Sequence, residues 1–130
     1  MKKEATLALI GRVTLASIFV LFGFMKIGTF AGMVAYAASA GVPFPQLAIV
    51  VAIVVELIGG LMILVGYKTK LVALAIAIFL VPVTLYFHTN FGDQVNLTMF
   101  WKNLSIFGGL LILAAHGAGS YSIDAKLARR

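Results

Sequence analysis

The chain has 130 residues, and its composition excludes an ordinary soluble domain. Apolar residues make up 62% of the chain, whereas only ten residues are basic and four are acidic. So few charges cannot cover a globule of this size, because a soluble domain draws on about 25% charged residues. The mean hydropathy of +1.10 indicates a protein whose main solvent is lipid. Cysteine is absent, which excludes disulfides and thiolate metal sites within the chain.

The formal net charge is +6, but the basic residues do not form a nucleic-acid surface. They are single or paired, lie near the edges of apolar runs, and form no stripe with interleaved aromatic residues. We therefore expect the lipid bilayer, and not nucleic acid, to be the partner of this chain.

Four long apolar runs follow one another along the chain, each long enough to cross a bilayer, which takes about 20 residues. They lack the strict alternation of a transmembrane β-strand. We predict helices near 6–28, 46–66, 70–88 and 102–119, with bounds good to about three residues. The predicted fold class is all-α: one integral membrane domain, residues 1–130, folded as a four-transmembrane-helix bundle.

The uncharged segment 29–45 joins the first two spans. Its apolar residues recur at helical spacing from Phe30 to Ala37, and Gly41 and Pro43 then favour the end of a helix. We predict a short interfacial helix between helices 1 and 2.

An even number of spans returns both termini to the same side of the membrane. The basic residues divide unequally between the two sides, and the positive-inside rule then puts both termini in the cytoplasm. The side of the termini carries Lys2, Lys3, Lys68, Lys70, Lys126, Arg129 and Arg130, whereas the opposite side carries Lys26 and Lys102.

Glu56 is the most informative single residue, because it lies near the middle of the second span. A carboxylate at that depth is costly and calls for a partner. Arg12, inside the first span, is the partner that we expect, forming a buried charge pair. Two interpretations stay open for Glu56: a structural ion pair that locks two helices together, and a site for a proton or a ligand.

A second group of polar residues lies at the opposite ends of helices 1, 3 and 4 from the termini. We predict an outer polar cavity formed by Lys26, His88, Asn90, Lys102 and Asn103. Two cations, one imidazole and two amides suit an anionic or carbonyl-bearing headgroup, including a quinone. Lys26 has a plainer alternative, which is to extend to the lipid headgroups. No spacing matches a metal-ligand set, so no metal is expected.

Nearly the whole sequence resembles the DoxX family of small bacterial inner-membrane proteins. The similarity rests on GRVTLASIFVLFGFMKIGTFAG, VELIGGLMILVGYKTK and FHTNFGDQVNLTMFWKNLSIFGGLLILAAHGAGSYSID. It implies a four-helix bundle in the bacterial inner membrane. Some members of the family are membrane subunits of thiosulfate:quinone oxidoreductase, or of a redox complex with superoxide dismutase and a sulfurtransferase.

Two functions remain open. The first is an auxiliary, noncatalytic membrane subunit that binds a quinone or a lipid headgroup and anchors a redox complex. Its expected partners are soluble redox proteins or further copies of the chain, and quinone is the expected cofactor, with none bound covalently. The alternative is a small proton-coupled transporter that uses Glu56.

Overall fold

The computed structural model describes residues 2–130, and the regular secondary structure of that range is entirely helical, without β-strands. One π-helical turn, η1, interrupts the second membrane span between α3 and α4. The elements are α1 (Lys2–Gly28), α2 (Phe30–Ser39), α3 (Pro45–Ile53), η1 (Val54–Ile58), α4 (Gly59–Val65), α5 (Thr69–Phe87), α6 (Gln94–His116) and α7 (Ile123–Ala128).

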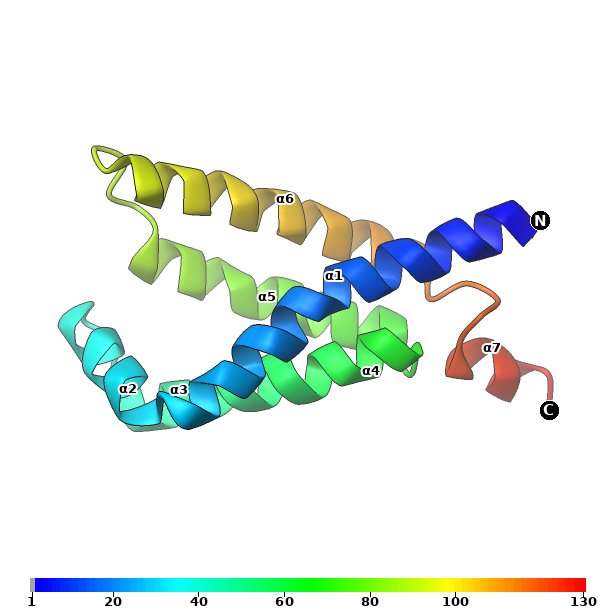
Figure 1. The fold of residues 1–130 in the computed structure, drawn as a ribbon, viewed down its shortest axis with the longest axis horizontal. Coiled ribbons are helices and arrows are strands. Elements are labelled where there is room, and N and C mark those ends of the chain that lie inside the picture. The colour runs from blue at the N-terminus through cyan, green and yellow to red at the C-terminus, as the bar shows by residue number, and fades with distance from the viewer. Residues whose placement is uncertain (1) are drawn as a thin grey trace.

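Four helical segments are long and apolar enough to cross a membrane, which confirms the predicted number of spans. They are Lys2–Gly28, Pro45–Val65, Thr69–Phe87 and Gln94–His116. The N- and C-termini lie at the same end of the molecule in Figure 1, as an even number of spans requires. We call this the terminal end, and we call the end that carries α2 and the α5–α6 connection the distal end.

The four spans pack as two pairs. Helices α5 and α6 run antiparallel side by side, while α1 packs along α3, η1 and α4. Helix α1 makes little contact with α6. The buried core at the junction of the pairs includes Phe19, Ile63, Ile76 and Leu110, together with the small residue Ala16.

Small residues allow the closest helix contacts. A Cβ atom added at Gly23 would lie 2.6 Å from the backbone nitrogen of Leu57, and one added at Gly60 would lie 3.0 Å from the backbone nitrogen of Val20. In lipid, such close backbone approach replaces the hydrophobic driving force between helices. Gly108 of the fourth span, in contrast, would have no neighbouring atom within 4 Å of an added Cβ.

The predicted interfacial segment is helical, as α2. It folds against the distal end of α5, where the rings of Tyr36 and Phe87 stack with centroids 5.0 Å apart. This contact closes one side of a cavity described below.

The fourth span begins at Gln94, well before the predicted start near 102. The reason is an N-cap: the Asp93 carboxylate accepts a hydrogen bond from the backbone N–H of Asn96 at 3.2 Å. The same helix ends at His116, within three residues of the predicted end near 119, because Gly117 takes a positive φ of 84°. The structure adds a short helix, α7, which the Ser122 hydroxyl caps and which the hydropathy pattern does not predict.

Candidate functional site

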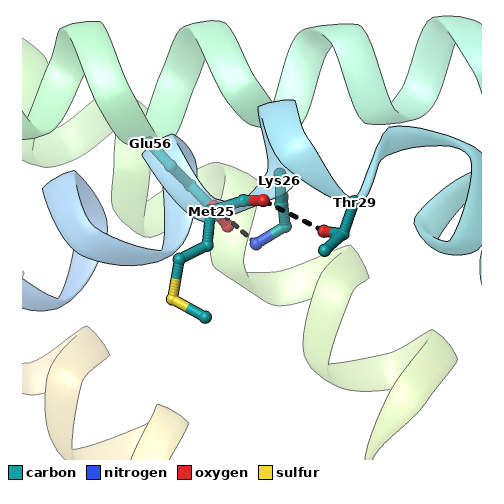
Figure 2. Close-up of polar contacts among 4 residues, drawn as sticks. All are labelled: Met25, Lys26, Thr29 and Glu56. Carbon is teal, nitrogen blue, oxygen red and sulfur yellow. Dashed lines mark hydrogen bonds and ion pairs between the residues drawn. The ribbon is translucent and has the colours of Figure 1, made fainter.

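The centre of the site is an ion pair between the first two spans. The Nζ atom of Lys26 lies 2.7 Å from Oε2 of Glu56, and the two side chains are 17% and 12% exposed (Figure 2). Lys26 stands in the last turn of α1, and Glu56 stands in the π-helical turn. A neighbouring hydrogen bond from the Thr29 hydroxyl to the carbonyl of Met25 reinforces the end of the helix that presents Lys26.

The predicted pair of Arg12 with Glu56 is therefore wrong. Arg12 is buried and donates from Nη1 to the carbonyl of Ala118, and from Nη2 to the carbonyls of Tyr121 at 2.8 Å and Leu64 at 3.3 Å. These carbonyls lie where α4 ends and where the chain turns after α6, so no intrahelical N–H competes for them. Arg12 thus binds the C-terminal segment to the bundle. Lys26, and not Arg12, forms the ion pair with Glu56.

The π-helical turn sets the position of Glu56. In this turn the N–H of Gly59 reaches back to the carbonyl of Val54, one residue further than in an α-helix. Single π-helical turns inside α-helices occur often at functional sites, because the extra residue changes the face that a side chain takes. No sequence signal marks this turn, since its residues are ordinary apolar helix residues apart from Glu56.

The ion pair lines a cavity of about 450 Å³ at the distal end, between α2, α3 and α5. We call it the distal cavity. Its wall is mostly apolar and aromatic, and it also carries the imidazole of His88, which follows α5. Besides Lys26, Glu56 and His88, the lining includes Met33, Tyr36, Phe44, Leu47, Ile49, Val51, Phe79, Pro82, Val83, Tyr86 and Phe87.

The surroundings of His88 disfavour the charged form of its imidazole. Burial lowers the pKa of His88, the positive charge of Lys102 lowers this pKa further, and the side chain of Asn96 offsets only part of the effect. A neutral imidazole donates from one nitrogen and accepts at the other. The distal cavity thus combines a hydrogen-bond donor and acceptor with an ion pair whose charges cancel.

Phe44 is a further member of the lining, and sequence reasoning missed it. It holds a left-handed backbone with φ of 49°, although it is not a glycine, and its side chain is 77% exposed. Such a conformation costs about 1–3 kcal/mol and is found preferentially at binding sites. The turn between α2 and α3 therefore places the Phe44 side chain at the cavity, although Phe44 must adopt an unfavourable left-handed backbone conformation to reach it.

The predicted outer polar cavity is only partly correct. The structure brings Lys26 and His88 to one cavity, together with Glu56, but Asn90 and Lys102 are exposed and do not line it. Asn103 is buried, and its amide donates to the hydroxyl of Thr84 at 3.0 Å.

Asn103 instead lines a separate cavity of about 160 Å³ between α5 and α6. A buried amide inside a membrane span needs a partner, and the neighbouring helix supplies one. The expectation of five groups in one cavity is wrong because depth in the membrane does not determine the helical face on which a residue lies. Among residues 2–130, no group of three or more histidine, aspartate or glutamate residues could hold a metal ion.

Comparison with known proteins places the chain in a family. The model of the DoxX family matches residues 7–89. The inner membrane protein YqjF of Escherichia coli K12 is 42% identical over 129 residues, which cover 99% of this chain and 98% of that protein. The inner membrane protein YphA of the same organism is 38% identical over 125 residues, covering 92% of this chain and 89% of YphA.

A more distant similarity extends to eukaryotes. The ER-derived vesicles protein ERV29 of Saccharomyces cerevisiae is 35% identical over 79 residues, which are 57% of this chain and 26% of ERV29. No solved structure matches the chain. With the family match, the two inner-membrane relatives and four apolar spans, the chain belongs to the DoxX family and is a multi-pass protein of the inner membrane.

Proposed function

We propose that the distal cavity binds a membrane quinone and that the protein is an auxiliary subunit which holds this quinone for soluble redox partners. The observation that carries the proposal is the Lys26–Glu56 ion pair in the wall of an otherwise apolar cavity. A quinone matches this lining, because its ring and isoprenoid tail are apolar while its carbonyl oxygens accept hydrogen bonds. The Lys26 ammonium and the His88 imidazole both supply donors.

A quinone fits better than a lipid headgroup at this end of the molecule. The opposite charges of Lys26 and Glu56 cancel, so the cavity offers no net charge to an anionic phosphate. Burying an unpaired ionic headgroup among apolar side chains would be costly. A neutral ring with two carbonyl groups avoids this cost.

The auxiliary role follows from the chemistry of the lining. Lysine, glutamate and histidine exchange protons and hydrogen bonds, but they do not carry electrons in ordinary quinone chemistry. Electrons would therefore come from a partner protein, as the redox complexes described for some DoxX members suggest. In this role the chain positions the quinone and sets the polarity around its carbonyl oxygens.

Quinone retention tests the proposal directly. The protein is purified in nanodiscs that contain ubiquinone, the discs are separated from free lipid, and the quinone is extracted and counted for each protein molecule. We expect quinone above the level of empty discs, and a loss of about tenfold for the double variant Lys26→Met with Glu56→Leu, since a buried charge-assisted hydrogen bond disappears. Lys126→Met, which changes an exposed lysine of α7, is the matched control. Equal retention by wild type and double variant would overturn the proposal.

A proton-coupled transporter is the second candidate, and one observation favours it. Glu56 is a carboxylate inside a membrane span and lines a cavity, which is the arrangement of a proton-exchanging group. In proteoliposomes, uptake of a solute that depends on a pH gradient and disappears in Glu56→Gln would support this function. Retained quinone without any such uptake would favour the auxiliary subunit.

A further inference from the structure

A second binding region lies at the terminal end, on the other side of the molecule from the distal cavity. Because α1 and α6 make little contact, an open groove of about 670 Å³ runs between their halves nearest the termini. Most of its lining is small or apolar, and the polar members are Thr14, Arg12, whose guanidinium donates to backbone carbonyls, and His116 at one end. The small and apolar members are Ala8, Gly11, Leu15, Gly109, Ile112 and Leu113. No side chain of the described residues fills this groove.

The groove continues into a basic pocket. His116 and Gly117, where α6 ends, line both the groove and a neighbouring pocket of about 460 Å³. This pocket also carries Lys68 and Lys70, at the start of α5. The stem of Lys70 crosses the junction, because a Cβ atom added at Gly117 would lie 3.1 Å from Cε of Lys70. An apolar channel and a cationic head region thus meet at one place.

The pocket carries two lysines against one acidic residue, so Asp124 offsets only part of the positive charge. Asp124 accepts hydrogen bonds from the backbone N–H groups of Lys68 at 2.7 Å and Thr69 at 2.9 Å, so both of its oxygens face the start of α5. The Lys68 ammonium lies over the ring of Tyr67 at 5.6 Å, and Lys70 has no acidic partner at salt-bridge distance among residues 2–130. The pocket keeps a positive excess.

The depths of the basic pocket and the apolar groove in the membrane match the positions of the phosphate and the acyl chain of a phospholipid. His116 ends the fourth span and Lys70 begins the third, so both stand at the membrane boundary. Gly109 is seven residues before His116, which places the apolar floor of the groove about 10 Å deeper in the bilayer. This offset is the distance from a phosphate to the upper part of an acyl chain.

We infer that an anionic phospholipid binds here, with its phosphate at Lys70 and His116, assisted by Lys68, and one acyl chain in the groove between α1 and α6. Charge complementarity selects the anionic class, since basic pockets between membrane helices bind anionic headgroups. The site is independent of the proposed quinone cavity, because the two share no lining residue.

Native mass spectrometry can count lipids retained by the protein. The full chain is delipidated in detergent, exposed to equal amounts of phosphatidylglycerol and phosphatidylcholine, and released from the micelle in the gas phase. We expect one phosphatidylglycerol to be retained in preference to phosphatidylcholine. Lys70→Ser should lower this preference about fivefold, because each lysine near an anionic headgroup has about that effect. The exposed Lys126→Ser is the control for nonspecific charge, and it should leave the preference unchanged.

A second variant tests the groove separately from the charge. Gly11 lines the groove, and a Cβ atom added there would meet no other atom within 4 Å, so Gly11→Leu extends a side chain into the groove from an open position. It should reduce retention of both lipids, whereas Gly28→Leu, at an equally open position at the distal end of the same helix, should not. Because both positions are open at Cβ and both changes remove a glycine from a helix, neither variant should melt below wild type.

Four outcomes would overturn the inference. They are equal retention of the two lipids by wild type, equal effects of Lys70→Ser and Lys126→Ser, displacement of the lipid by inorganic phosphate alone, and a dimer whose formation Gly11→Leu abolishes. Displacement by phosphate would identify a free-anion site, and the dimer would identify a second copy as the occupant of the groove.

Discussion

Lys26 and Glu56 are thirty positions apart in the chain, yet Nζ and Oε2 lie 2.7 Å from each other across the contact of α1 with η1. Both side chains are largely buried within a protein that is itself surrounded by lipid. Each charge therefore depends on the other for its stability. The first prediction tests this dependence.

Removing either partner of the ion pair should destabilise the protein strongly. Lys26→Ala or Glu56→Ala leaves one uncompensated buried charge, which commonly costs about 3–5 kcal/mol. The double variant Lys26→Met with Glu56→Leu should recover much of the loss, because no charge remains buried. Thermal unfolding in detergent measures all three variants. Additive losses in the double variant would show that the two residues do not depend on each other.

Arg12 should hold the C-terminal segment in place. Arg12→Leu removes three hydrogen bonds to the carbonyls of Ala118, Tyr121 and Leu64, and should cost about 3 kcal/mol, because hydrogen bonds to charged groups are the strong ones. Limited proteolysis should then cut the chain after α6 faster than in wild type. A cleavage rate equal to that of wild type would contradict this function of Arg12.

The contact of Asp124 with α5 should depend on pH. Burial alone would raise the pKa of Asp124, but hydrogen bonds from Thr69 and from the backbone of Lys68, with the charge of Arg12, lower this pKa below its ordinary value. A carboxyl group with a lowered folded pKa stabilises the protein above its unfolded pKa, near 3.9. The stabilisation is lost as the pH falls through the folded pKa.

Melting temperatures of wild type and Asp124→Asn, measured from pH 7 downward, check this prediction. The wild type should be the more stable at pH 7, and the difference should shrink below about pH 4. A difference that stays constant down to the lowest accessible pH would show that the Asp124 charge does not stabilise the start of α5.

Replacing Gly23 with any residue that carries a Cβ atom should lower the stability of the protein. A Cβ atom there would lie 2.6 Å from the backbone nitrogen of Leu57, so Gly23→Ala must push α1 away from η1 and should cost about 1–3 kcal/mol. Gly11→Ala, on the same helix with open space around it, is the matched control and should be neutral or slightly stabilising. Unfolding in mixed detergent micelles compares the two. Equal stability of both variants would contradict the close approach.

Both termini should lie in the cytoplasm. They share one end of the molecule, and most of the basic residues of the connections lie at that end (Figure 1). A reporter active only in the periplasm should be silent when fused after Arg130 and active when inserted beside Asp93. The reverse pattern would show the opposite orientation.

The sequence is sufficient to predict the membrane spans, but it does not predict which residues are the partners of the buried charges. Hydrophobic length and charge spacing are one-dimensional quantities, so four spans and the helix between the first two can be predicted from them. The choice between Arg12 and Lys26 as the partner of Glu56 depends on which side chains share a helix face and on which carbonyls lack N–H donors. Both properties, the shared helix face and the unpaired carbonyls, follow from tertiary packing. They therefore cannot be derived from the sequence before the fold is known.

Local capping accounts for the remaining differences. Asp93 is a recognisable N-cap residue, and a search for caps could have placed the start of α6 at Gln94. Ser122 carries the same signal for α7, although hydropathy does not reveal that helix because the segment is short and polar. The π-helical turn differs from these two, since it has no residue that marks it.

The π-helical turn η1 also determines how far α3 and α4, the two halves of the second span, are rotated relative to each other about the helix axis. An α-helix advances about 100° for each residue, so the residue inserted at η1 turns α3 relative to α4 by about that angle. Deleting one residue between Val54 and Ile58 would restore a regular helix, yet it would leave either Glu56 or the Gly59–Gly60 pair on the wrong face. The extra residue of η1 therefore allows two features to occur in one span: the close glycine packing of its terminal half and the ion pair of its distal half.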